Sequence, residues 1–203
     1  MQKLLYILFC ITLISCNSKK EEIEEEVIVF SDNETTIYES DIYKVINAFY
    51  EVYSSRISKK EYLKDNATVY LLFNSQPDNF ELVDTKLLEK IVEQSLIEEK
   101  DKEFIYQQIK NSKEITLDKS KISDFKLTDK KTLSKLLFSE ENQTKNERDN
   151  FVYDIASIYL PLFTINKNKV LVYGYSFVFG GNCISIYEKK NEKWIWLKTF
   201  VSE

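Results

Sequence analysis

The C-terminal part of the chain contains three segments rich in β-branched and aromatic residues that are joined by short turns. We predict strands over residues 170–179, 183–188 and 194–201. The first turn, Gly180-Gly181-Asn182, requires positive φ angles, and the second is a polar loop over residues 189–193. Connections this short join antiparallel neighbours, so the pattern predicts a β-meander.

Upstream of this block, apolar residues recur at helical spacing. The largest set occupies one face of a helix predicted over residues 41–55: Ile42, Val45, Ile46, Phe49 and Tyr53. Three further helices are predicted to begin at capping residues: Asp84, Asp101 and Thr128. Residues 68–73 and 151–160 indicate two additional strands. Helices followed by an antiparallel sheet predict an α+β fold, with N-terminal helices packed on a C-terminal antiparallel β-meander.

The N-terminus has the layout of an export signal. Lys3 supplies a positive charge, and residues 4–14 form an uncharged apolar run. As a helix this run rises about 16 Å, too short for a hydrocarbon layer of about 30 Å, which favours a secretory signal over a membrane span. The following sequence, Leu13-Ile14-Ser15-Cys16, resembles the lipobox of bacterial lipoproteins. This resemblance implies that residues 1–15 are a signal peptide and that Cys16 becomes the acylated first residue.

Residues 16–36 are predicted to form the lipidated cysteine and an acidic tether. The segment from Lys19 to Glu26 holds five Glu and two Lys with one apolar residue, and is too polar to pack. Residues 27–30 are either a short strand or part of this tether. An acidic stretch after the cysteine resembles the signal that routes some Gram-negative lipoproteins to the outer face of the outer membrane. We therefore expect an outer-membrane protein that is anchored through acyl chains on Cys16. Its domain faces either the periplasm or the cell exterior, and both alternatives stay open.

The rest of the chain, residues 37–203, is predicted to be a single α+β globular domain. Its composition excludes several kinds of site. The 203 residues include no His, so a Ser-His-Asp or Cys-His catalytic unit and a His-ligated metal are impossible. Three Gly cannot form a glycine-rich phosphate loop, and two Arg with a pI near 5.1 argue against nucleic acid. We expect no cofactor and no metal.

After removal of the signal and lipidation of Cys16, Cys183 is the one remaining thiol. It begins an apolar alternating run, which favours a buried, inert thiol over a nucleophile. The surrounding block, with its glycine pair, nearby cysteine, K-x-N-x-K-W hairpin and Pro-Leu-Phe segment, resembles a family of uncharacterised Gram-negative lipoproteins. Members often have a second Gly after the cysteine, where this chain has Ile184. The resemblance implies architecture and assigns no catalytic residues.

Aromatic residues of the C-terminal strands are the candidates for a binding surface. Alternation places Tyr173, Tyr175 and Phe177 on one face of their strand. Trp194 and Trp196 share a face of the last strand, on which alternation also places Lys198 and Phe200. If these sets meet they form a recognition surface for a protein or a glycan; if the helices cover them they are core.

From these features we expect a non-enzymatic binding module for an envelope protein or glycan. An immunity- or inhibitor-type lipoprotein that neutralises a toxin or lytic enzyme is the first alternative, since an acidic surface suits a basic target. A carboxylate-dependent envelope hydrolase is the second, and it requires a pair of buried acids in a deep cleft. The oligomeric state is left open.

Overall fold

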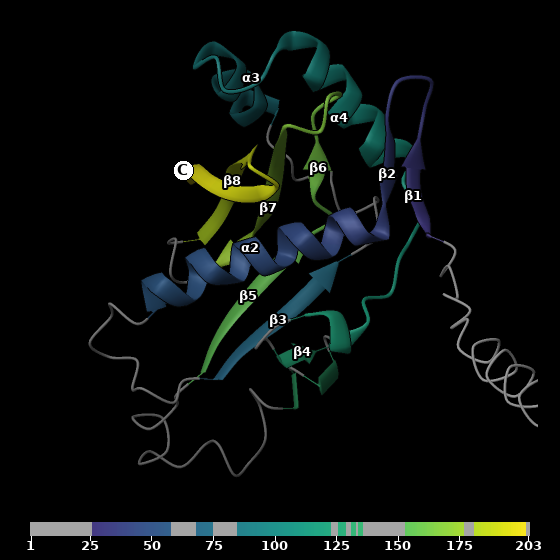
Figure 1. The fold of residues 1–203 in the computed structure, drawn as a ribbon. Helices are drawn as coiled ribbons and strands as arrows, with labels where there is room; N and C mark the ends of the chain where they lie inside the picture. The colour runs from purple at the N-terminus through teal and green to yellow at the C-terminus, as the bar shows by residue number, and fades with distance from the viewer. Residues whose placement is uncertain are drawn as a thin grey trace, which may run out of the picture.

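A seven-stranded mixed sheet forms the centre of the fold, with helices on both of its faces (Figure 1). The computed structural model describes residues 26–57, 68–74, 85–122, 126–128, 131–132, 134–135, 153–176 and 181–201. The strands follow one another across the sheet as β4 (Lys126–Thr128), β3 (Thr68–Asn74), β5 (Tyr153–Tyr159), β7 (Lys169–Ser176), β8 (Gly181–Lys190) and β9 (Lys193–Val201), and β6 (Leu162–Phe163) pairs with β7. The predicted α+β class is confirmed.

The predicted meander is present as β7, β8 and β9, which are consecutive antiparallel neighbours. β5 also runs antiparallel to β7, and the two strands approach closely at Gly174. A Cβ at this position would lie 2.2 Å from the backbone oxygen of Ser157, so this approach requires glycine. Pro161 lies between β5 and β6. Both strands pair with the same edge of β7, β5 near its end and β6 near its start.

The sheet also contains a parallel part. β3, which corresponds to the strand predicted over residues 68–73, pairs in parallel with both β4 and β5. Parallel neighbours need a long crossover connection, and the chain between β3 and β5 contains the helices α3 (Thr85–Glu93) and α4 (Glu99–Asn111) and the short 3₁₀ helix η2 (Lys119–Lys121). The meander therefore extends a mixed sheet rather than forming the whole of it.

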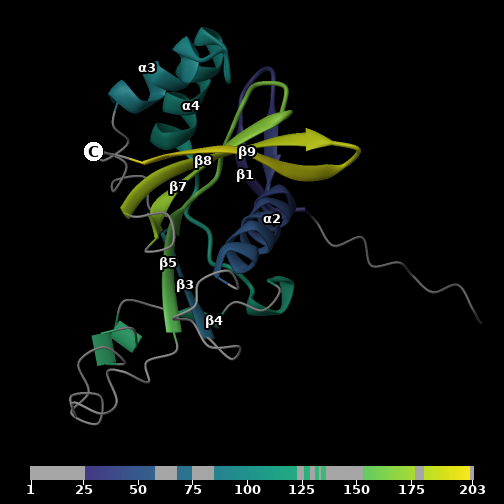
Figure 2. The same cartoon turned by 90° about the vertical axis from the view of Figure 1, so that its left-hand side faces the viewer.

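Helices cover the meander from both sides (Figures 1 and 2). On one side, which we call the α2 face, Arg56 of α2 (Glu39–Ile57) lies 4.6 Å from the ring centre of Trp196. On the other, the α3–α4 face, Lys198 donates a hydrogen bond to Gln94 at 2.7 Å and Lys169 to the carbonyl of Leu96 at 2.6 Å. Consecutive residues at the centre of β7 and β8 point to opposite faces, and because both faces are covered, all of them are buried: Val170, Leu171, Val172, Tyr173, Ile184, Ser185, Ile186 and Tyr187.

Part of the segment predicted as tether is a β-hairpin. β1 (Ile28–Ser31) pairs with β2 (Thr36–Tyr38), so the short strand is the alternative observed for residues 28–30, and the tether prediction is wrong for residues 31–36. The side chain of Asp32 accepts hydrogen bonds from the backbone N–H groups of Glu34 and Thr35 and so shapes the connecting turn. Phe30 packs edge-on against Phe104 of α4, with ring centres 5.4 Å apart. The apolar residues at positions 27–30 are therefore part of the folded body.

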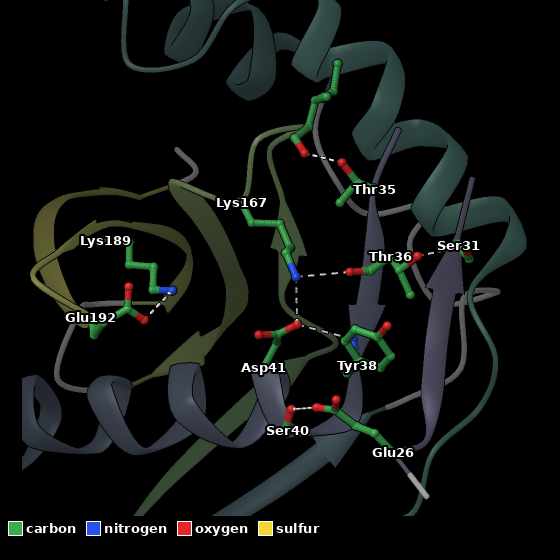
Figure 3. A network of polar contacts seen from close by, with 11 residues as sticks. Glu26, Ser31, Thr35, Thr36, Tyr38, Ser40, Asp41, Lys167, Lys189 and Glu192 are labelled. Carbon is green, nitrogen blue, oxygen red and sulfur yellow. Dashed lines mark hydrogen bonds and ion pairs between the residues drawn. The ribbon is translucent and has the colours of Figure 1, made fainter. Parts of the chain in front are cut away.

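The turn after β6 is fixed by a set of residues that we call the polar clamp: Thr35, Asp41, Asp101, Gln108 and Lys167. The Lys167 amine donates to the Thr36 carbonyl at 3.0 Å and lies 3.3 Å from the Asp41 carboxylate (Figure 3). Thr35 donates to the carbonyl of Ile165. The hairpin and the first turn of α2 are thereby tied to this turn of the sheet.

The other half of the clamp comes from α4. Asp101, which we expected to cap this helix, lies inside its first turn, because the helix begins at Glu99. Its two carboxylate oxygens accept backbone N–H groups of Glu98 and Ile165, at 3.0 and 3.1 Å. Gln108 donates to the carbonyl of Phe163 at 2.6 Å and accepts its N–H at 2.9 Å. Both side chains are buried, and both are used to hold backbone.

Candidate functional site

A groove lies between α2 and the first half of β9. Its volume is about 630 Å³. The α2 residues that line it lie at helical spacing on one stripe: Lys44, Asn47, Ala48, Glu51 and Val52. The opposite wall is a continuous run from Glu192 to Trp196. At 1.5 Å per helical residue and about 3.3 Å per strand residue, the two walls each extend about 12 to 13 Å.

Both tryptophans of the chain are in this groove. Trp194 packs edge-on against Phe163, with ring centres 5.9 Å apart. Trp196 carries the Arg56 guanidinium over its ring and donates its indole N–H to the Thr199 hydroxyl at 3.0 Å. Each ring is half-buried, so one part of it belongs to the core and the rest remains accessible. Partly exposed tryptophans whose orientation is fixed in this way are typical of binding surfaces.

Charged side chains surround the two rings. Glu192 forms an ion pair with Lys189 at 2.7 Å (Figure 3), and this contact, with Lys44 nearby, lowers the pKa of the Glu192 carboxyl. Lys193 is exposed, and no ion pair to it is formed within the described part of the chain. In the groove lining Lys44 and Lys193 balance Glu51 and Glu192, and Arg56 adds a positive charge over the Trp196 ring, although the chain carries a net charge of −5. The surroundings of the two rings are therefore not acidic, although the protein as a whole is.

The structure divides the predicted aromatic set between the two faces. Tyr173 lies opposite Ile184 and Trp196 lies opposite Tyr187, and residues 184 and 187 of β8 point to opposite sides. Tyr173 is buried against Tyr159 on the α3–α4 face, and Tyr175 on the same side is exposed. Trp194 and Trp196 are on the α2 face. The described members of the two sets therefore do not meet, and the condition for a joint recognition surface is not fulfilled; Phe177 and Cys16 lie outside the described residues.

A β-bulge explains a second difference. Ile186 lies opposite Lys198 whereas Tyr187 lies opposite Trp196, so β9 contains one extra residue, Leu197. The extra residue reverses the alternation, and Lys198 and Phe200 point to the α3–α4 face, away from the tryptophans. Simple alternation had placed all four side chains together. The sequence contains no turn residue at Leu197 that signals the bulge.

Cys183 and Asp101, the other candidates for chemistry among the described residues, are part of the folded core. Burial raises the pKa of the Cys183 thiol to about 12, which leaves it protonated and unreactive near neutral pH. Asp101 is the buried acid of the described residues, and its oxygens bind backbone N–H groups. Among these residues no group of three or more Cys, Asp or Glu side chains is placed to hold a metal ion.

A smaller hollow of about 300 Å³ lies between the β1–β2 turn and α4. It is lined by polar groups that include Asp32, Glu34, Lys100 and Glu103. Asp32 is used by the turn itself. The hollow lacks the aromatic surface of the groove, and we do not treat it as the candidate site.

Sequence reasoning identified the two tryptophans but missed the wall that faces them. The α2 residues Lys44, Ala48 and Glu51 lie beside its predicted apolar face, and only the packing of α2 on β9 turns this stripe into part of a site. Comparisons with protein-family models, with curated proteins and with solved structures found no match to this chain. None of the helices that the structure describes is long and apolar enough to cross a membrane.

Proposed function

We propose that this protein is a lipid-anchored outer-membrane lipoprotein whose folded body is a non-enzymatic binding module. The observation that carries the binding role is the groove with two half-buried tryptophans, which offers aromatic surface and hydrogen-bonding rim groups to a protein or glycan of the envelope. The lipobox-like sequence at Cys16 supports the anchor. The acidic residues that follow support export to the outer membrane.

The anchor is tested separately from the groove. A single acyl chain binds membranes marginally, and stable anchoring needs at least two signals, so a multiply acylated Cys16 should resist a carbonate wash. We expect Cys16→Ser to release the protein from the membrane fraction or to leave it unprocessed. A Cys16→Ser protein that still fractionates with washed membranes would refute the anchor and leave the groove untouched.

The groove is tested by photo-cross-linking in intact cells. A photoreactive amino acid replaces Glu51, an exposed residue of the groove wall, and in a matched control it replaces Glu89, an exposed glutamate of α3 outside the groove. We expect a discrete adduct from position 51 that is absent from position 89. Mass spectrometry distinguishes a protein partner from a glycan. The same adducts from both positions, or none from position 51, would refute the binding role of the groove.

A further inference from the structure

Besides its tryptophan side chains, the groove has backbone groups along the edge of β9 that no described strand pairs with. Within the described residues, β8 is the only strand that pairs with β9, which therefore forms one edge of the sheet. An edge strand presents unpaired backbone N–H and C=O groups, which are a template for another extended chain. Its first four residues, Lys193–Trp196, precede the bulge and also form a wall of the groove.

The turn between β8 and β9 determines which peptide groups face outward. Asn191 and Glu192 both have positive φ angles, 49° and 62°, as in a two-residue primed turn. In such a hairpin the flanking residues, Lys190 and Lys193, form a hydrogen-bonded pair, and hydrogen-bonded and non-hydrogen-bonded pairs then alternate. Lys189 with Trp194 and Tyr187 with Trp196 are consequently non-hydrogen-bonded pairs.

An independent hydrogen bond supports this assignment. The backbone N–H of Lys189 donates to the carbonyl of Asn168 at 2.7 Å, on the side of β8 away from β9. Its partner Trp194 must therefore direct its own N–H and C=O away from β8, and so must Trp196. The two tryptophans present their rings to the groove and their backbone groups to the open edge, roughly 7 Å apart along the strand.

We propose that the groove binds an extended acidic polypeptide segment, which adds to β9 as a further strand. This inference rests on the proposed binding function and names its ligand class. The row of backbone donors and acceptors at residues 194 and 196 matches another peptide backbone in extended form. Alternate side chains of the added strand enter the groove against the tryptophans, Ala48 and Val52, and these positions suit apolar residues.

Charge determines the other alternate positions. Successive residues of β9 point to opposite faces, so Lys193 points away from α2 whereas Trp194 points toward it. Side chains of the added strand that point away from α2 therefore lie on the same face as Lys193. No described residue pairs with the Lys193 amine, and Lys44 and Arg56 flank the groove side. A second copy of this chain is a poorer occupant for two reasons. Its own β9 would place Lys193 and Lys198 beside the same lysines of the first copy, and its bulge would interrupt the hydrogen bonds between the two strands.

The probe is a labelled synthetic peptide of alternating glutamate and valine, as long as β9, titrated by fluorescence anisotropy against the full-length protein in detergent. We expect saturable binding. The same peptide with N-methyl groups on alternate amides retains its side chains but loses the edge hydrogen bonds, and should bind at least about tenfold more weakly, as should a lysine-valine peptide. The tryptophan emission of the protein should shift on binding, since both tryptophans line the groove.

Matched variants locate the site. Lys193→Glu should weaken binding of the glutamate-valine peptide several-fold, whereas Lys110→Glu, at an exposed position of α4 outside the groove lining, should leave it unchanged. No binding of this peptide, or equal binding of its N-methylated form, would overturn the inference. A concentration-dependent dimer that the peptide does not dissociate would assign the edge to a second copy and would also overturn it. If position 51 still cross-links a partner in cells, the proposed binding function stands although the peptide inference has failed.

Discussion

The two ends of α2 meet the sheet in different ways. Near its start, Asp41 and the preceding hairpin are tied to the turn around Lys167 by hydrogen bonds (Figure 3). Asp101 of α4 completes the polar clamp through its bond to the backbone of Ile165. Further along, the α2 residues between Lys44 and Val52 form one wall of a groove, and the first half of β9, with two half-buried tryptophans, forms the other. The clamp uses its buried polar groups to fix backbone, while the groove leaves aromatic surface accessible.

This difference separates residues that hold the fold from residues available to a partner. In the clamp, the polar atoms of Asp101 and Gln108 already have backbone partners. In the groove, the rings of Trp194 and Trp196 are only partly covered. Substitutions in the clamp should therefore lower stability, and substitutions in the groove should lower binding more than stability.

The largest loss of stability is expected from Gln108→Leu. The change leaves the buried N–H and C=O of Phe163 without partners, and each unpaired buried group costs about 1 to 3 kcal/mol. For a protein of this size the melting temperature should fall by about 4 to 24 °C, measured by circular dichroism. Gln107→Leu, at an exposed position on the same helix, is the control and should change stability by about 0.5 kcal/mol or less. Equal melting of the two variants would contradict the clamp.

The tryptophan variants should have a smaller effect on stability. Truncation of a fully buried tryptophan costs about 3 to 5 kcal/mol, and a half-buried ring should cost about half of this in chemical denaturation. Trp196→Ala also removes the ring beneath Arg56 and the indole N–H that donates to the Thr199 hydroxyl, which keeps its hydrogen bond with Ser185. A full core-sized loss for both Trp194→Ala and Trp196→Ala would show that the rings are core, and would weaken the comparison between the two regions.

Alkaline pH should weaken the fold through buried acids. Burial raises the pKa of Cys183 to about 12, and burial with the hydrogen bond to Glu39 raises that of Tyr43 to about 12. In the unfolded chain these groups lose their protons near pH 8.5 and 10, so the unfolded state binds fewer protons above those values. Stability should be unaffected by them below about pH 8.5 and should fall up to about pH 12, by at most about 1.4 kcal/mol per pH unit for each group.

Cys183→Ala provides the control for this pH dependence. The variant lacks the thiol, so its melting temperature should fall less steeply between about pH 9 and pH 11 than that of the parent protein. Identical slopes for the two proteins would mean that the thiol titrates alike in the folded and unfolded states. Alkylation followed by mass spectrometry should likewise find Cys183 protected in the folded protein at pH 8, because a buried protonated thiol is a poor nucleophile.

The smallest effect is expected at the exposed side of the clamp. Lys167→Met removes the ion pair with Asp41 and the bond to the Thr36 carbonyl, but the lysine is partly solvent-exposed. Partly exposed ion pairs contribute about 0 to 1 kcal/mol, so the denaturation midpoint should shift only slightly. A loss of stability as large as that of Gln108→Leu would show that the contacts of Lys167 with the hairpin and α2 stabilise the clamp as much as those of α4 do.

Local patterns were sufficient for the elements but not for their assembly. The spacing of Ile42, Phe49 and Tyr53 predicted α2, and the alternation around Gly181 and Asn191 predicted the meander. Long-range pairing was not readable, because nothing in the sequence of β3 specifies that it pairs in parallel with β5. Nor does any residue type signal the bulge at Leu197, which separates Lys198 from the tryptophans. The bulge determines which side chains of β9 share a face with the tryptophans.

The most direct test of the account is the yield of the position-51 cross-link in cells that carry Trp196→Ala. The measurement is made below the melting temperature of the variant, so that the protein is folded and Glu51 remains on the same wall of the groove. We predict that the adduct is lost in Trp196→Ala and retained in Gln108→Leu under conditions where that variant is also folded. An adduct that survives in Trp196→Ala, or that is lost only with unfolding, would contradict the assignment of the tryptophan groove as the binding site.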